Sequence, residues 1–126
     1  MALQQYFEEK NGLGVLSTAD EKGVVNTAVY ARPHVLEDDT VAFVMANRLS
    51  HANLAANPHA SYLFKEEGHG YRGKRLSLTK IKEEHDTALL HSLRRRTYSD
   101  EQEAKMKPLS LVYFRVDEER PLVGAF

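Results

Sequence analysis

The longest β-prone stretch of the chain is Val24-Val25-Asn26-Thr27-Ala28-Val29-Tyr30-Ala31-Arg32-Pro33-His34-Val35-Leu36. Its branched and aromatic residues predict a strand, with Pro33 at an edge or a bulge because proline cannot donate to a ladder. Turn-forming residues border it at 20–23 and 37–40 and predict hairpins on both sides. The next strand is predicted over residues 41–46, because neither Pro nor Gly interrupts this apolar run.

Shorter elements are predicted around these two strands. Strands are expected at residues 15–18, 60–64, 71–82 and 109–116. Short helices are expected at residues 4–10, at 50–57 with Ser50 as N-cap, and after the capping residues Asp86 and Ser99. The order contains no βαβ alternation, and rolling an antiparallel sheet into a barrel removes its exposed edges. We therefore predict a mainly β fold, an antiparallel barrel of about six strands with short flanking helices, in one domain over residues 1–126.

Composition narrows the class of protein. The chain has 126 residues, of which 42% are hydrophobic and 28% charged, as is typical of a globular domain. Its longest apolar run, residues 41–46, is far shorter than the ~20 residues of a membrane-spanning helix. The formal net charge of −1 disfavours nucleic-acid binding, which needs a positive excess. With no visible secretory signal and no cysteine, a cytoplasmic location is expected.

The stretch at residues 24–36 would present two different faces as a strand. One is mostly apolar and suits a barrel interior: Val25, Thr27, Val29 and Ala31. The other is more polar: Asn26, Ala28, Tyr30, Arg32 and His34. The polar row is either the solvent-exposed face of a half-buried sheet or a ligand-binding surface. In the second case, Asn26 and Thr27 bind a flat heterocycle and the small Ala28 leaves room for its ring. The strand alone does not decide between the two.

A second candidate site is Arg48-Leu49-Ser50-His51-Ala52-Asn53, where a predicted strand leads into a helix. A helix start exposes unpaired N–H groups and a partial positive charge, and therefore suits an anion. Arg48, Ser50 and His51 would complete a phosphate cradle. The alternative is that Ser50 merely caps the helix while Arg48 is solvated. The two interpretations compete only in part, because N–H groups that the cap leaves free remain available.

Other chemistry finds little support. The six histidines show no metal-binding spacing such as HExxH, and the absence of cysteine excludes thiolate nucleophiles and thiolate ligands. The sequence contains no GxGxxG, GxxxxGK[ST] or GxSxG motif. We therefore predict no metal site and no catalytic side chain.

Four segments, taken in order, resemble the pyridoxamine 5'-phosphate oxidase-like FMN-binding split barrels, and among them the small bacterial FMN-binding proteins. They are Gly14-Val15-Leu16-Ser17-Thr18, Val25-Asn26-Thr27-Ala28-Val29-Tyr30-Ala31-Arg32-Pro33, Val41-Ala42-Phe43-Val44 and Ser50-His51-Ala52-Asn53-Leu54-Ala55-Ala56-Asn57-Pro58. The resemblance covers about residues 10–85, and the last third of the chain matches mainly in its closing strand. Its specificity comes from the ordered set rather than from one motif.

This resemblance implies a homodimer of six-stranded Greek-key split barrels with two FMN molecules in clefts at the subunit interface. By position, Asn26, Thr27 and Ala28 would lie along the flavin ring, and Arg32 would lie nearby. The loop from Ala46 to Ser50, which includes Leu49, and the start of the following helix would hold the phosphate, with Arg48, Ser50 and His51 as its contacts. Many relatives carry a lysine where this chain has Leu49 or Ser50, and Arg48 or His51 could replace its charge. The arginine-rich C-terminal substrate signature of pyridoxamine phosphate oxidases is also missing, so vitamin B6 synthesis is not predicted.

The resemblance leaves three functions open. The first is an FMN-dependent redox protein or oxidoreductase, in which the flavin carries the electron or hydride chemistry. The second is a carrier or sensor that holds flavin or heme without turnover, with His34, His51, His59 or His69 as an axial ligand for heme. The third is a ligand-free barrel that acts as an interaction domain.

Overall fold

The computed structural model describes residues 2–37, 40–85, 87–94 and 99–124. Within these ranges the strands are β1 (Gly12–Ala19), β2 (Val25–Val29), β3 (His34–Glu37), β4 (Thr40–Met45), β5 (His59–Glu66), β6 (Gly73–His85) and β7 (Ser110–Pro121). The helices are α1 (Leu3–Glu9), α2 (Leu49–Ala56), α3 (Ala88–Leu93) and α4 (Asp100–Met106). The predicted mainly β class with short helices is confirmed. Residues 38–39 of the predicted 37–40 turn lie outside the described residues.

All seven strands form one antiparallel sheet in the order β2-β1-β5-β6-β7-β4-β3. The edges are β2 and β3, which follow each other in the chain, and no ladder joins them among the described residues. The predicted count of six strands is wrong, because the stretch predicted as one strand over 24–36 forms both edges. The chain leaves the sheet between them at residues 30–33, where Pro33 has no N–H to donate.

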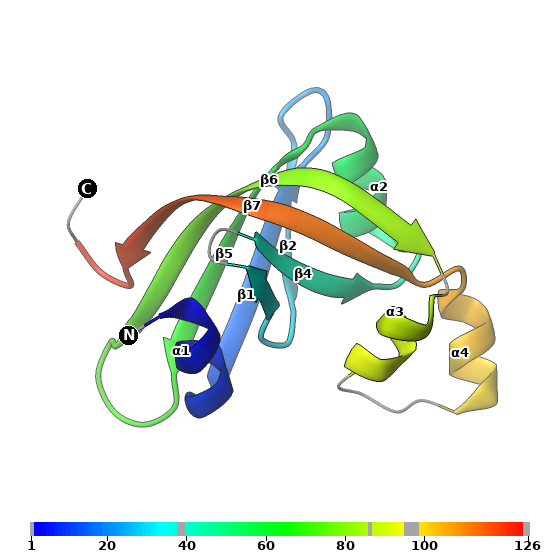
Figure 1. Ribbon diagram of the computed structural model, residues 1–126. Helices are drawn as coiled ribbons and strands as arrows, with labels where there is room; N and C mark the ends of the chain where they lie inside the picture. Colours follow the sequence, from blue (N-terminus) through cyan, green and yellow to red (C-terminus); the bar gives the residue numbers. More distant parts are fainter. Residues whose placement is uncertain (1, 38–39, 86, 95–98, 125–126) are drawn as a thin grey trace.

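Contacts between rings show that the sheet is rolled around a core. Phe43 of β4 and Tyr62 of β5 have ring centroids 5.0 Å apart, although β6 and β7 separate these strands in the sheet. Helix α1 adds Phe7, whose ring lies 5.4 Å from that of Phe64. Figure 1 shows the long β6 and β7 crossing the molecule together, with α1 near one end of the pair and α3 and α4 near the other.

Tyr62 fixes the place where β2 ends. Its hydroxyl donates to the main-chain carbonyls of Tyr30 and Ala31, each at 3.2 Å. A Cβ on Gly14 would lie 1.9 Å from this hydroxyl oxygen and 2.4 Å from the Tyr30 carbonyl oxygen. Only glycine therefore lets the tyrosine reach these carbonyls across β1. The carbonyls are drawn inward, and the chain turns from β2 toward β3.

The two faces of β2 are the reverse of the predicted ones. The side chains of Val25 and Val29 are 65% and 56% exposed, whereas Asn26 and Ala28 are half-buried. The expectation that Val25, Thr27 and Val29 face a barrel interior is therefore wrong. As an edge strand, β2 has a ladder with β1 alone, and its inner face lines a cleft rather than the packed core.

Helix α2 begins one residue before its predicted N-cap. Arg48 is the N-cap, and Ser50 is the second helical residue, so the predicted cap at Ser50 is wrong. Ser50 is instead buried and its hydroxyl accepts a hydrogen bond from Asn26 Nδ2 at 3.3 Å. In the second turn, Asn53 Nδ2 donates to Thr18 Oγ1 of β1 at 3.1 Å. Helix α2 is thus held against β1 and β2 by polar side chains.

Two further helices, α3 and α4, follow β6 in the chain and precede β7 (Figure 1). The predicted cap Asp86 lies outside the described residues, and the Thr87 hydroxyl caps α3 by accepting from the Leu90 N–H. The predicted capping box at Ser99 is confirmed, with Gln102 as its second member. Among the described helices, none combines the length and apolar character needed to cross a membrane.

Candidate functional site

A cleft of about 330 Å³ lies between β2 and the corner where β4 leads into α2. This volume is in the range of small-molecule sites, ~300–1,000 Å³. Its lining residues come from β2, the 30–33 connection, β3, β4, the 46–48 loop, α2 and the β6–β7 connection: Asn26, Ala28, Val29, Tyr30, Ala31, Arg32, His34, Phe43, Val44, Ala46, Arg48, Leu49, Ser50, Leu93, Arg94 and Leu109.

Most of the predicted site residues surround this one cleft. The structure places seven of them in its lining: Asn26, Ala28, Arg32, Ala46, Arg48, Leu49 and Ser50. They belong to two separate segments, 26–32 and 46–50, which the resemblance assigns to the ring and the phosphate of one cofactor. The two segments therefore face a common space, and the Asn26–Ser50 hydrogen bond joins them directly.

The other two predicted residues, Thr27 and His51, are not among the described residues that line the cleft. Thr27 is exposed on the outer face of β2, where its Oγ1 lies 3.2 Å from Ser17 Oγ. His51 bonds residues of β6 and β7 instead. The alternation of side chains along a strand predicts this position of Thr27, because Asn26 and Ala28 lie on the opposite face.

Sequence reasoning missed one wall of the cleft. Leu93 and Arg94 come from the end of α3, and Leu109 from the residue before β7. These positions are more than 40 residues from the predicted site segments in the chain. No local pattern marks them, because only the fold brings the end of α3 and the residue before β7 to the cleft.

The described lining carries positive charge and no carboxylate. Its basic side chains are Arg32, His34, Arg48 and Arg94. One nitrogen of Arg32, Nη1, donates to the carbonyls of Phe7 and Lys10 at 3.0 and 2.9 Å, and so closes the C-terminal end of α1. Arg32 thus has a structural task in addition to its place in the lining. The charge balance of the cleft suits an anionic ligand.

The start of α2 is suited to a phosphate. Among the described residues, no side chain caps its first turn. Leu49 is 57% exposed at this turn, and Arg48 precedes it with an exposed side chain. The unpaired N–H groups and the helix dipole favour an anion here. Ala28, Val44, Leu93 and Leu109 supply apolar surface elsewhere in the cleft, as a ring would need.

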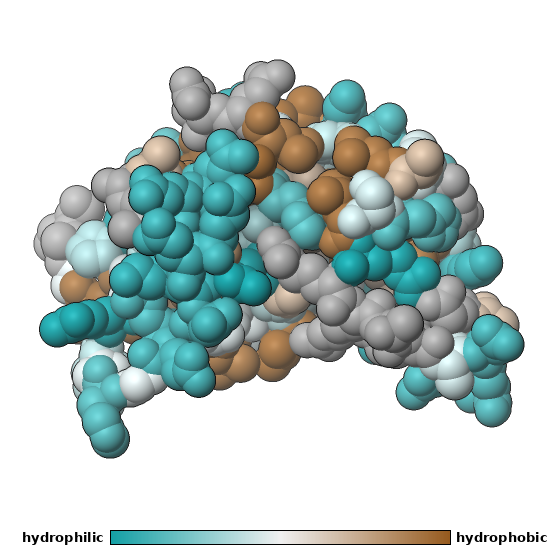
Figure 2. All heavy atoms as spheres, turned by 60° about the horizontal axis from the view of Figure 1, so that its bottom comes forward, coloured by the Kyte–Doolittle hydropathy of each residue, from teal (hydrophilic) through white to brown (hydrophobic). Residues whose placement is uncertain are grey.

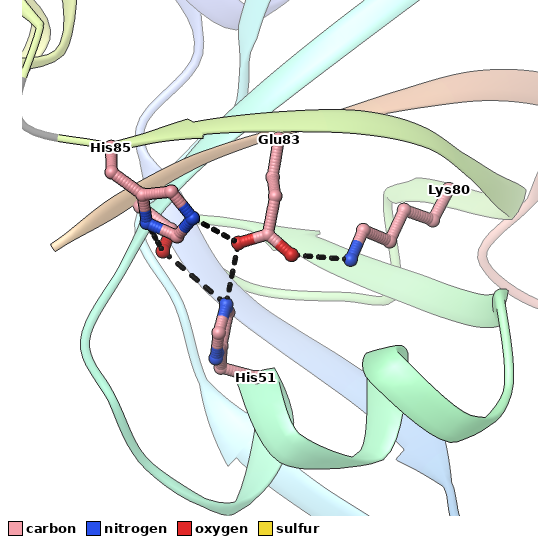
Figure 3. Close-up of polar contacts among 5 residues, drawn as sticks. His51, Lys80, Glu83 and His85 are labelled. Atoms are coloured by element: carbon pink, nitrogen blue, oxygen red, sulfur yellow. Dashed lines mark hydrogen bonds and ion pairs between the residues drawn. The ribbon is translucent and has the colours of Figure 1, made fainter. Parts of the chain in front are cut away.

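Behind the start of α2 lies a polar cluster, which we call the His51 network: His51, Lys80, Glu83, His85 and Ser110 (Figure 3). His51 Nε2 lies 2.7 Å from Glu83 Oε2 and 3.2 Å from Ser110 Oγ. Lys80 Nζ donates to Glu83 Oε1 at 2.6 Å, and Ser110 Oγ lies 3.0 Å from His85 Nδ1. Among the described residues, no group of three or more His, Cys, Asp or Glu is arranged to hold a metal ion.

Two opposing effects set the pKa of Glu83. Burial raises it, but hydrogen bonds from His51 and Lys80 and the charges of both outweigh burial and lower the pKa from 4.5 to about 2. Glu83 is therefore ionised at neutral pH and acts as the acceptor for His51 and Lys80, and His85 Nε2 lies 3.4 Å from its Oε2. On the neighbouring strand β7, the hydroxyl of Tyr113 donates to Glu84 of β6, and this bond together with burial raises the pKa of Tyr113 to about 12.

No protein-family model matches this sequence, and a comparison with curated proteins gives no match. Solved structures do match. An FMN-binding protein from Syntrophomonas wolfei is 17% identical, with a TM-score of 0.76 over 99% of this chain and 86% of that chain. A proposed pyridoxamine 5'-phosphate oxidase from Lactobacillus delbrueckii is 14% identical, with a TM-score of 0.68 over 95% of this chain and 92% of that chain.

A third solved structure belongs to a protein with a different ligand. The heme storage protein HutZ from Vibrio cholerae is 17% identical, with a TM-score of 0.68 over 96% of this chain and 95% of that chain. At these identities the likeness concerns the fold. The predicted resemblance to the FMN-binding split barrels is confirmed at that level.

Replacing Glu83 with Gln should remove a pH-dependent part of the stability. Because folding lowers the pKa of Glu83, the wild type gains stability that is fully present above pH 4.5 and is lost as the pH falls toward 2. The free energy of unfolding, measured with denaturant from pH 7 to pH 2, should be lower for Glu83→Gln above pH 4.5, and the difference should shrink toward pH 2. The exposed Glu21→Gln variant is the control. Parallel curves for the wild type and Glu83→Gln would contradict the assignment.

Proposed function

We propose that this chain is an FMN-binding flavoprotein, a small redox protein or oxidoreductase. The observation that carries the proposal is the cleft itself, which brings segments 26–32 and 46–50 together around one carboxylate-free lining within the described residues. A flavin ring needs an apolar slot with a few polar groups, and its phosphate needs cations and amide donors. The fold shared with the FMN-binding protein from Syntrophomonas wolfei gives independent support.

Each part of the cleft has a task in this proposal. Asn26 and Ala28 would lie along the ring, with Thr27 contributing main-chain groups from the same strand. Arg48, Ser50 and the first N–H groups of α2 would hold the phosphate, and Ala46 and Leu49 would shape the loop between. The bound flavin would supply the electron or hydride chemistry, while the protein binds and orients it. The chain needs no catalytic side chain for this task.

We also propose that the protein is a cytoplasmic homodimer of Greek-key split barrels with FMN at the subunit interface. Support comes from the outer face of β2, β1 and β5, where apolar side chains stand side by side. Val29 pairs with Val15, and Val15 pairs with Leu63. Val29 and Leu63 are 56% and 38% exposed, and nearby Leu13 is 54% exposed. We call these four residues the apolar face. Figure 2, in which the bottom of Figure 1 comes forward, shows hydrophilic side chains gathered over its left half and hydrophobic ones mostly toward its top.

A second candidate function is a non-catalytic carrier of flavin or heme. The match with the heme storage protein HutZ favours it, as does His34, which lines the cleft and could serve as an axial ligand. The carboxylate-free lining would also suit the propionates of heme. An absorption spectrum of the purified protein separates the cofactors, because heme gives a Soret band and flavin does not.

Removing the phosphate contacts should weaken FMN binding. The double variant Arg48→Ala, Ser50→Ala loses one charge and one hydroxyl at the phosphate end, where charge-assisted hydrogen bonds contribute about 1.5–3 kcal/mol each. Its dissociation constant for FMN, measured by quenching of flavin fluorescence, should rise by about a hundredfold or more. Arg72→Ala, which changes an exposed arginine outside the lining, should bind like the wild type. Equal affinity of the double variant and the wild type would place the phosphate elsewhere.

Charging the apolar face should separate the subunits. Leu13→Asp would bury an unpaired carboxylate in the proposed interface, which costs far more than leaving it in water, and Leu13 lies outside the cleft lining. Sedimentation velocity should show a dimer for the wild type and a monomer for this variant. Ile81→Asp is the matched control, because Ile81 is similarly exposed at 53% but lies on β6 outside the apolar face. A wild type that sediments as a monomer at all concentrations would refute the interface.

A further inference from the structure

The proposed phosphate end of the cleft, at the start of α2, lies beside three adjacent strands, β6, β7 and β4. At this corner His85 of β6 pairs with Ser110 of β7, and Ser110 pairs with Met45 of β4. The chain leaves β4 after Met45 and enters α2 at Leu49. The loop that lines the cleft therefore begins beside Ser110 and His85, and its position depends on what holds the start of α2.

His51 folds back onto this row. Its Nε2 lies 2.7 Å from Glu83 Oε2 and 3.2 Å from Ser110 Oγ, so one ring nitrogen of the first turn of α2 reaches both β6 and β7 (Figure 3). The acceptor is itself fixed, because Glu83 also receives Lys80 Nζ at 2.6 Å. The side chains of His51, Lys80 and Glu83 are 18%, 15% and 21% exposed, so water competes little for these bonds.

The residue before His51 is held from the other side. Ser50 lies in the cleft lining and accepts from Asn26 Nδ2 of β2. The first turn of α2 is thus tied to β2 through Ser50 and to β6 and β7 through His51. These ties fix the direction in which the N–H groups of Leu49 and Ser50 point, while the hydrogen bonds of His51 go to β6 and β7 and not to the ring side of the cleft on β2.

We propose that His51 and Glu83 are positioning residues that hold the first turn of α2 for the phosphate and so determine how strongly the cleft prefers FMN to riboflavin. This proposal rests on the proposed FMN site. Loss of the hydrogen bond between His51 and the charged Glu83 frees the first turn of α2 to move. This movement weakens the contacts with the phosphate and spares those with the ring. His51 acts through the helix and does not touch the ligand.

Electrostatics alone predicts the opposite effect for one variant. Glu83→Gln removes a negative charge near the phosphate, and this should strengthen FMN binding if the charge acts only through space. Positioning predicts weaker binding, because the neutral amide is a poorer acceptor for His51. The sign of the change therefore separates the two explanations.

The experiment measures dissociation constants for FMN and riboflavin by fluorescence quenching in the wild type, His51→Ala, His51→Gln and Glu83→Gln. His51→Ala and Glu83→Gln should each reduce the preference for FMN over riboflavin by about tenfold, with riboflavin affinity nearly unchanged. His51→Gln retains a donor at the position of Nε2 and should recover much of the preference. His59→Ala, an exposed histidine on β5, is the control.

Four results would overturn the proposal in distinguishable ways. If the wild type prefers FMN and the variants keep that preference, positioning by His51 is wrong and the FMN site stands. If Glu83→Gln binds FMN more tightly, the charge acts through space and positioning is again wrong. If the wild type binds neither flavin, the proposed function fails together with the inference. If it binds both equally, the phosphate adds no affinity, so the inference fails while flavin binding stands. Circular dichroism checks the fold, and the near-isosteric Glu83→Gln variant carries the test if His51→Ala does not fold.

Discussion

The hydrogen bonds from the Tyr62 hydroxyl to the carbonyls of Tyr30 and Ala31 hold the chain at the place where β2 ends. They reach across β1 only because Gly14 has no side chain. The Tyr30 N–H still donates to the Gly14 carbonyl, and the chain then leaves the sheet through residues 30–33, so that β2 and β3 form opposite edges of the same sheet. The cleft lies beside this connection, which supplies part of its lining.

The opening between the edges acquires its chemistry from what surrounds it. The inner face of β2 presents Asn26 and Ala28, the corner after β4 presents Arg48 and Ser50, and the described lining has no carboxylate. Polar contacts on two sides then hold the start of α2: Asn26 on one and the His51 network on the other. A shared fold accounts for the sheet, whereas these particular side chains make the cleft suited to a phosphorylated ring.

Local patterns in the sequence predicted much of this and missed what depends on distant contacts. The strands, the capping box at Ser99 and the antiparallel class follow from alternation and turn residues. The break between β2 and β3 was missed because β-prone residues continue through 24–36, while the Tyr62 hydroxyl that bonds residues 30 and 31 lies about 30 positions away. The inverted faces of β2 were missed because an edge strand beside a cleft need not turn its valines inward. Seven predicted site residues line the cleft, yet Arg94 carried no local signal and His51 points to β6.

One ligand that bridges β2 and the start of α2 would perturb both segments together. Amide chemical shifts of the ¹⁵N-labelled protein, followed during titration with FMN, report on each segment separately. The largest shifts are expected on the amides of Leu49 and Ser50 and on those of Asn26 and Ala28, with both groups reaching saturation at the same FMN concentration. Shifts confined to other elements, or the absence of any shift at saturating FMN, would contradict a ligand that bridges the two segments.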